Sequence, residues 1–241
     1  SSGGPFGLGG QADYARLEGN PVHEDIVEAS RLVGPDFLLN VVLDERGNFV
    51  RVVAGDVIEA HREGCRAVDA IYGHPIEEPS DLVISAYGGY PKDIDLRQVH
   101  KGLESTCRAV RKGGAVILFA ECPEGAGETE LFHFMVSCES PEEMAEAAKK
   151  EFNIGAFKAW KLACLSEWAE LILISAMEEE LVRKMRMTPA RSPEEAMAIA
   201  RERLGDNPSI YVIPDSSLVL PIPTFAPEEV AGRALKEPKT H

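Results

Sequence analysis

The sequence is poor in the residues that build metal-binding or disulfide-rich proteins. Its five cysteines, at positions 65, 107, 122, 138 and 164, are an odd number and form no C-x-x-C pair, and no histidine lies at metal-ligand spacing from them. This pattern argues against a zinc site and against a disulfide scaffold. The sequence also contains no G-x-G-x-x-G and no G-K-[ST] motif, so neither a Rossmann dinucleotide site nor a Walker ATPase is supported.

Basic residues and long apolar runs are scarce as well. Forty acidic against 25 basic residues give a formal charge of -15, the wrong sign for binding phosphate backbones or anionic lipid. No apolar run approaches the roughly 20 residues of a membrane-spanning helix, and the Gly-rich start does not resemble a secretory signal. We therefore expect a soluble, cytoplasmic protein that binds neither nucleic acid nor membranes. The absence of an initiator Met suggests a processed product or a fragment of a longer polypeptide.

The chain has enough apolar content for one large domain or two small ones, since 44% of its 241 residues are hydrophobic. In its first part, the spacing of apolar residues predicts a helix from Pro21 that ends at Gly34. Runs rich in Val, Leu and Phe at 37–44 and 48–56 predict a β-hairpin, and Asp56 can cap a helix that continues through residue 70. These elements form the first part of the chain.

The pattern changes to α/β beyond a Pro-rich stretch at residues 74–80. Four buried-strand runs, at 81–87, 114–120, 171–177 and 209–215, alternate with helical segments near 93–111, 128–137, 141–151, 156–165 and 192–205. Strands joined through helices imply right-handed parallel crossovers. We predict an α/β fold with a mostly parallel sheet of four or more strands flanked by helices, preceded by a β-hairpin and helix segment from a second domain. The predicted domains are residues 1–75 and 76–241.

The most suggestive candidate site follows the strand at 81–87, because open parallel sheets bind ligands where strands end and turn into helices. Gly88 and Gly89 permit close approach of a ligand to the backbone next to Tyr90, and Asp93 is a plausible N-cap for the following helix.

On that helix Gln98 and Lys101 lie close together on one face, so an amide and an ammonium can bind a carboxylate together. On spacing alone, a solvent-facing helix with ordinary polar residues is the stronger interpretation. We expect no catalytic role for His61 or His133, which lie within amphipathic helices, or for His100, which points about 100° around the helix from Lys101.

Several segments, in the same order and spacing, resemble the C-terminal part of the nickel-dependent lactate racemase family. The most specific is GGYPKD with Gln98 and Lys101 after it, and an independent match is the run from Ala54 to Cys65. The other matching segments are ARLEGNPVHEDIVE, LLNVVLD, RKGGAVILFAECPEG and FKAWKLA.

This resemblance implies a racemase or epimerase that acts on a 2-hydroxy acid by reversible hydride transfer to a nickel-pincer nucleotide. In family terms Gln98 and Lys101 resemble the pair that binds the substrate carboxylate, with Gly88, Gly89 and Tyr90 as pocket backbone. Trp160, in FKAWKLA, resembles a substrate-side aromatic that excludes water from the hydride path. An ordinary helix-core tryptophan is an equally good interpretation of that residue.

Two departures from the family pattern limit what the resemblance implies. Lactate racemases place a tyrosine before the glutamine, whereas this chain has Arg97, which adds a bidentate cation and favours a larger or more acidic 2-hydroxy acid. The family's cofactor-tethering lysine, nickel-binding histidine and acid/base histidines belong to an N-terminal half that would precede Ser1. We therefore expect no catalytic residue or metal ligand in this chain, no cofactor bound by it alone, and activity only with the missing N-terminal half. The alternative is a non-catalytic α/β carboxylate-binding or interaction module.

Overall fold

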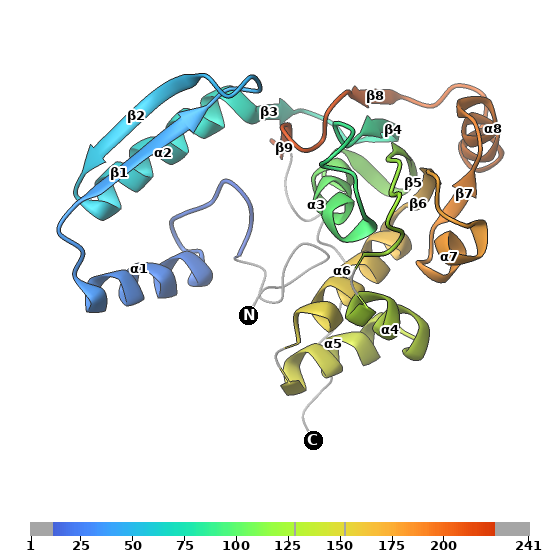
Figure 1. Ribbon diagram of the computed structural model, residues 1–241. Coiled ribbons are helices and arrows are strands. Elements are labelled where there is room, and N and C mark those ends of the chain that lie inside the picture. The colour runs from blue at the N-terminus through green and yellow to red at the C-terminus, as the bar shows by residue number, and fades with distance from the viewer. Residues whose placement is uncertain (1–11, 128, 152, 225–241) are drawn as a thin grey trace. The chain divides into compact units, whose positions relative to one another are not determined.

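The computed structural model describes residues 12–127, 129–151 and 153–224, and divides into two units whose junction falls between His74 and Pro75. Figure 1 labels the elements of both units. Most of the Gly-rich start lies outside the described residues.

The first helix of unit 1, α1 (Pro21–Val33), begins at Pro21 and ends before Gly34, as predicted. The Asn20 side chain accepts hydrogen bonds from the backbone N–H groups of Val22 and His23, and Gly34 ends the helix in the left-handed conformation with φ of 65°. None of the thirteen residues of α1 is buried. The helix is therefore set by its own ends and not by a core beneath it.

A hairpin and a second helix complete unit 1, as predicted. β1 (Leu38–Leu43) and β2 (Phe49–Gly55) pair antiparallel, and Asp56 caps α2 (Val57–Tyr72), which lies along one face of the hairpin (Figure 1). The buried hydrophobic side chains of the described part of unit 1 are Val42, Val53 and Ala60. Gly64 of α2 packs close to Val53, since a Cβ on this glycine would lie 3.6 Å from the valine methyl. The hydrophobic core of unit 1 is small.

Unit 2 is built on a parallel sheet in the order β7-β6-β5-β4-β8. Its strands are β4 (Ser80–Ala86), β5 (Val110–Phe119), β6 (Glu170–Ile174), β7 (Thr188–Ala190) and β8 (Ile210–Ile213). The predicted α/β class and parallel sheet are confirmed. The sheet has four or more strands, as predicted, although β7 was not among the strands expected. The run at 209–215, predicted as a buried strand, instead forms the edge strand β8, in which Ile213 is the buried residue.

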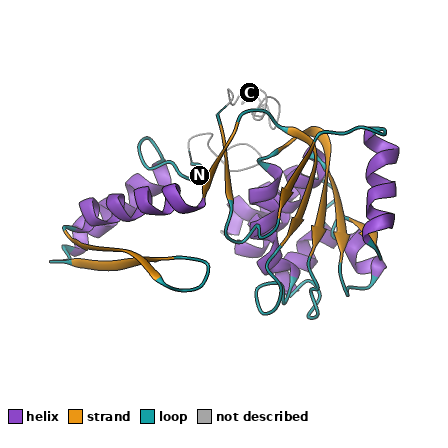
Figure 2. Cartoon of the chain, turned by 90° about the horizontal axis from the view of Figure 1, so that it is seen from above, coloured by secondary structure: helices purple, strands orange, loops and turns teal. Residues whose placement is uncertain are grey.

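Helices cover both faces of this sheet, as Figure 2 shows. On one face α8 (Pro193–Leu204) packs Ala196 and Ala200 against a cluster of strand residues that includes Leu82 and Ile117. The other face carries α3 (Leu96–Cys107) and α6 (Ile154–Trp168), which also contact each other. The remaining helices of unit 2 are α4 (Thr129–Ser137), α5 (Pro141–Glu151) and α7 (Glu179–Lys184). This arrangement leaves the carboxyl ends of the central strands available for a site.

Some helix and strand boundaries in the structure differ from the predicted ones. The N-cap of α3 is Asp95, not Asp93, and the helix ends at Cys107, after which Ala109 accepts a hydrogen bond from the Ser80 backbone and β5 begins at Val110. The short strand β3 (Gly73–Ile76), which was not predicted, pairs with β9 (Leu220–Pro223). Both contain proline, which is depleted in strands and obscures them in a sequence pattern.

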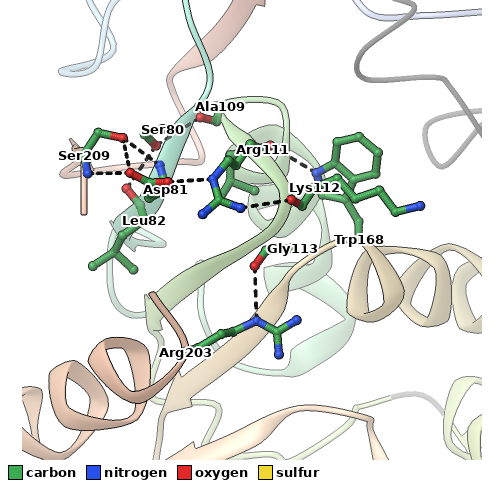
Figure 3. Close-up of polar contacts among 11 residues, drawn as sticks. Ser80, Asp81, Leu82, Ala109, Arg111, Lys112, Gly113, Trp168, Arg203 and Ser209 are labelled. Carbon is green, nitrogen blue, oxygen red and sulfur yellow. Dashed lines mark hydrogen bonds and ion pairs between the residues drawn. The ribbon is translucent and has the colours of Figure 1, made fainter. Parts of the chain in front are cut away.

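A polar network ties together the amino ends of the strands (Figure 3). The Asp81 carboxylate accepts bonds from the backbone and hydroxyl of Ser209, each at 2.7 Å, and from Arg111 at 2.6 Å. Arg203 donates to the Gly113 carbonyl at 3.2 Å, and Trp168 donates to the Val110 carbonyl at 3.1 Å. The Ser209 and Arg111 bonds lower the pKa of Asp81 to about 2. This end of the sheet is therefore closed by contacts within the chain.

Candidate functional site

The turn after β4 has a backbone that only glycine adopts easily. Gly88 and Gly89 have φ values of 75° and 71°. A Cβ on Gly88 would lie 2.7 Å from a carboxylate oxygen of Asp215, which follows β8, so the turn also needs glycine for space. Lys92 donates to the same Asp215 carboxylate at 3.0 Å and to Ser217 at 2.8 Å. The carboxyl ends of β4 and β8 are thus locked to each other.

Asp93 joins this turn to the end of β5. Its side chain, 5% exposed, accepts a hydrogen bond from the Glu121 backbone at 2.9 Å, and its carbonyl accepts one from Cys122. The residue predicted to cap α3 therefore holds the neighbouring loop in place instead.

Asp95 caps α3 and lies beside the predicted Arg97. One oxygen of its buried carboxylate accepts a bond from the Gln98 backbone at 2.8 Å, and the other lies 3.8 Å from Nε of Arg97. A Cβ on Gly127 would lie 2.4 Å from the Asp95 carboxylate, so the loop after β5 packs directly on this cap. The start of α3 is consequently fixed by contacts on two sides, while the Arg97 side chain is 40% exposed.

The structure brings the two predicted clamp residues together. Lys101 donates from Nζ to Oε1 of Gln98 at 3.2 Å. Lys101 is exposed and Gln98 half-buried, so the pair lies at the surface of α3 near its start. In this arrangement the Gln98 amide nitrogen and the remaining ammonium protons can donate to one carboxylate.

One turn beyond Lys101, α3 carries a buried polar cluster that was not predicted. Glu104 and Lys161 of α6 form an ion pair at 2.6 Å, with side chains only 6% and 10% exposed. His100 is also buried, and burial, with smaller effects of the neighbouring charges, lowers its pKa to about 4. A lysine between Trp160 and Leu162 in an otherwise apolar stretch of α6 was the one sequence signal for this cluster.

Trp160 lies inside unit 2. Its side chain is fully buried on α6, with its ring centroid 5.6 Å from that of Phe157. Its indole Nε1 is buried without a hydrogen-bond partner. In this structure the residue packs in the helix layer.

A hollow of about 400 Å³ lies at the carboxyl ends of the central strands. It is lined by residues that include Ala86, Gly89, Asp93, Phe119, Glu121, Ile174 and Ser175. Gly89 is thus the predicted pocket-backbone residue that lines it, while Gly88 packs on Asp215 and Tyr90 is 74% exposed. The carboxyl ends of the strands, where the candidate site was predicted, therefore contain a hollow.

The side chains within the described residues do not form a nickel centre of their own. Among residues 12–127, 129–151 and 153–224, no three His, Cys, Asp or Glu side chains are grouped so that they could hold a metal ion. Burial raises the pKa of the Cys122 and Cys164 thiols to about 12, which leaves both as poor nucleophiles. Of the helices in the described part of the chain, none has the length and hydropathy to cross a bilayer.

Unit 2 is thus an α/β domain with an open parallel sheet. At the carboxyl ends of its strands, the first turn of α3 presents polar side chains. A family model described as the lactate racemase C-terminal domain matches residues 76–220, more than half of the chain. The chain therefore belongs to the lactate racemase family. It spans about half the length of the curated relatives that it matches.

Two of those relatives are named lactate racemase. The protein from Thermoanaerobacterium thermosaccharolyticum is 32% identical over 215 residues, which cover 86% of this chain and 50% of that protein. The protein from Lactiplantibacillus plantarum is 30% identical over 210 residues, covering 85% and 49%.

Solved structures agree with the sequence matches. The lactate racemase apoprotein from T. thermosaccharolyticum superimposes with a TM-score of 0.83 at 31% identity, over 89% of this chain and 52% of that one. A Thermotoga maritima protein gives a TM-score of 0.58 at 15% identity, over 85% and 54%, which shows the shared fold alone.

Proposed function

We propose that this chain is the C-terminal, substrate-holding part of a racemase or epimerase that acts on a 2-hydroxy acid. The observation that carries the proposal is the contact between Gln98 and Lys101 at the exposed start of α3. It supports binding of a carboxylate, which every 2-hydroxy acid has. The names of the matched relatives supply the reaction class.

The two proposed clamp residues have distinct tasks. The Lys101 ammonium supplies the charge, and its bond to Oε1 of Gln98 orients the glutamine so that the amide nitrogen points away from the lysine. Asp95 fixes the helix start beneath them through its bond to the Gln98 backbone. The carboxylate is thereby held at a defined place while the chemistry occurs at the adjacent carbon.

Arg97 supports a substrate that is more acidic than lactate. Its guanidinium lies at the same helix start, and the 3.8 Å separation from Asp95 leaves it free to turn its other nitrogens outward. We infer that Arg97 contacts a second acidic group of the substrate, as in a 2-hydroxy dicarboxylate such as malate.

The hydride acceptor that the resemblance implies is a nickel-pincer nucleotide. We assign its binding to the half of lactate racemase that this chain does not match, because the described residues offer no ligand set for nickel. The domain assignment follows the same logic: residues 1–75 as the trailing segment of a cofactor-binding domain, and residues 76–241 as the substrate clamp. We further propose that the complete enzyme acts in the cytoplasm.

The complete reading frame that encodes this chain, expressed beside the enzymes that assemble the cofactor, tests the proposal. We expect about one nickel per polypeptide and racemisation of at least one 2-hydroxy acid in a panel that includes lactate and malate. Lys101→Ala should lower kcat/KM by about 10- to 100-fold, as for loss of a charge-assisted contact. Arg97→Tyr should shift the preference from malate toward lactate. Glu28→Ala on exposed α1 is the matched control and should leave the kinetics unchanged.

The alternative of a non-catalytic carboxylate-binding module makes the opposite forecast for the same sample. It expects no nickel and no racemisation, but saturable binding of carboxylates that Lys101→Ala weakens. An active enzyme whose kinetics ignore Lys101→Ala would instead refute the assigned clamp.

A further inference from the structure

The hollow at the carboxyl ends of the central strands has a floor of apolar side chains. Ala86, Phe119 and Ile174 line it, and the strand register pairs Ala86 with Phe119 and Phe119 with Ile174. All three are half-buried, although each belongs to an interior strand of the sheet. The volume of about 400 Å³ lies within the roughly 300 to 1,000 Å³ that is typical of small-molecule pockets. The hollow therefore has room for a small organic molecule.

This apolar row lies on the face of the sheet that α8 covers. Phe119 and Ile174 pack against the cluster of strand residues to which α8 contributes. Helices cover both faces of the sheet (Figure 2), and α3, which carries the proposed clamp, lies on the other one. Neither Gln98 nor Lys101 lines the hollow. The hollow is therefore separate from the carboxylate clamp.

Asp93 brings an unpaired carboxylate oxygen to this hollow. The residue lines it and is only 5% exposed. Its Oδ2 accepts a hydrogen bond from the Glu121 backbone, whereas its Oδ1 is buried with no hydrogen-bond partner among the described residues. The neighbouring Lys92 pairs with Asp215 instead. Gly89 also lines the hollow, and a Cβ there would meet no atom within 4 Å, so the space beside Asp93 is open. Because a buried carboxylate is costly unless a cation or donor pairs with it, Asp93 needs a further partner.

The groups around the hollow disfavour an anion. Among the described residues that line it, Asp93 and Glu121 are acidic and none is a lysine, arginine or histidine. The backbone N–H groups of Ala120, Glu121 and Ala176 all donate to acceptors within the fold. A carboxylate or phosphate would thus meet two acidic side chains and no cation. An ammonium group would instead neutralise Asp93 and donate to its Oδ1.

We propose that this hollow binds a small organic ammonium ion, with the ammonium at Asp93 and an apolar body on the row of Ala86, Phe119 and Ile174. Glu121, at the exposed rim, adds a second negative charge, and the apolar row excludes water from the contact. Primary amines with an aromatic or aliphatic body are the ligand class. The proposal does not rest on the proposed function, because an amine and a 2-hydroxy acid need sites of opposite charge.

Benzylamine and benzoate, which are similar in shape and opposite in charge, test the proposal on the full chain. In titrations followed by two-dimensional amide NMR, we expect benzylamine to shift the signals of residues that line the hollow, such as Phe119 and Ile174. It should bind there at least about tenfold more tightly than benzoate. The signals of Gln98 and Lys101 report separately on the clamp, which benzoate should reach if the proposed function is right. The two proposals can therefore fail independently.

Two charge variants locate the ammonium. Asp93→Asn removes the charge at nearly constant shape and should weaken benzylamine binding by about tenfold or more. Glu121→Gln, at the exposed rim, should weaken it by only about two- to threefold because water screens that charge. Glu202→Gln on the exposed side of α8 is the matched control and should bind benzylamine like the wild type.

A filling variant keeps the test decisive if Asp93→Asn does not fold. Ala176→Phe, at an exposed lining position, leaves both acidic side chains in place and should weaken benzylamine binding by about fivefold or more, because its ring occupies the hollow. Absence of shifts around the hollow up to about 10 mM benzylamine overturns the proposal. So does equal affinity for benzylamine and benzoate, because the hollow would then select for apolar shape and not for charge.

Discussion

Units 1 and 2 both contain strands rich in apolar residues, but these residues are mostly exposed in unit 1 and mostly buried in unit 2. In unit 1 the described hydrophobic side chains that are buried number three, Val42, Val53 and Ala60, whereas unit 2 buries most residues of β4 and of α3. The difference in burial follows from the number of helix layers that cover each sheet. A sheet with helices on both faces can bury both side-chain rows of its central strands, but a hairpin with one helix can bury only one row. Burial therefore depends on what covers an element more than on its composition.

Ion pairs provide the largest expected contrast between the units. The Glu104–Lys161 pair of unit 2 is almost fully buried, while the Arg51–Glu63 pair of unit 1 is about half exposed. Glu104→Ala should cost about 3 to 5 kcal/mol because it leaves a buried ammonium without its partner, and Glu63→Ala less than about 1 kcal/mol. Urea unfolding followed by fluorescence of the two tryptophans, both in unit 2, measures the first, and hydrogen exchange in β2 the second. Joint replacement, Glu104→Leu with Lys161→Met, should restore most of the loss, and equal costs in both units would erase the contrast.

Two leucines sharpen the comparison with the chemistry held constant. Leu82 on β4 is 0% exposed and Leu39 on β1 is 65% exposed. We expect Leu82→Ala to lower the free energy of unfolding by about 2 to 5 kcal/mol and Leu39→Ala to change it by less than about 0.5 kcal/mol. Denaturant titrations of each single variant check this. A large cost at Leu39 would mean that this side chain is covered in the free chain.

Acid should loosen unit 2 through His100. Because the folded-state pKa of His100 is about 4, below the usual 6.5, the unfolded chain binds the proton more tightly. The stability is therefore full above pH 6.5 and declines as the pH falls toward 4, by up to about 1.4 kcal/mol per pH unit. His100→Leu should flatten this part of the unfolding-against-pH curve. His61, exposed in unit 1, is the matched control, and an equally flattened curve for His61→Leu would contradict the assignment.

Asp81 should make the stability of unit 2 depend on pH in a more acidic range than His100 does, and by a smaller amount. Its pKa of about 2 is below the usual 3.8, so its contribution is present above pH 4 and is lost as the pH falls from 4 to 2. Asp81→Asn should cost about 1 to 2 kcal/mol at pH 7 because it weakens the bonds to Ser209 and Arg111. The cost should shrink toward pH 2, which unfolding curves at several pH values will show. A cost that is independent of pH would point to shape and not to charge.

Local signals predicted much of this fold, and long-range contacts account for the rest. Gly34 and Asp56 mark helix ends through bonds to nearby backbone, so their sequence neighbourhood suffices to find them. β7 was missed because three residues with a proline give no period. The closeness of Gln98 and Lys101 was predictable from their spacing on one helix. The Glu104–Lys161 pair joins two helices that are distant in sequence, so the isolated Lys161 in α6 is a local signal that does not reveal its partner.

The place of β4 in the sheet has a consequence during protein synthesis. β4 pairs with β5 on one side and with β8 on the other, and the contact between Asp81 and Ser209 spans 128 positions of the chain. At about 5 to 20 residues per second, a ribosome needs roughly 6 to 26 s to supply that partner. Throughout that interval the nascent chain carries an apolar strand with one open edge, which is a template for aggregation. The last strand of the sheet, β8, therefore closes this edge only when synthesis of unit 2 is almost finished.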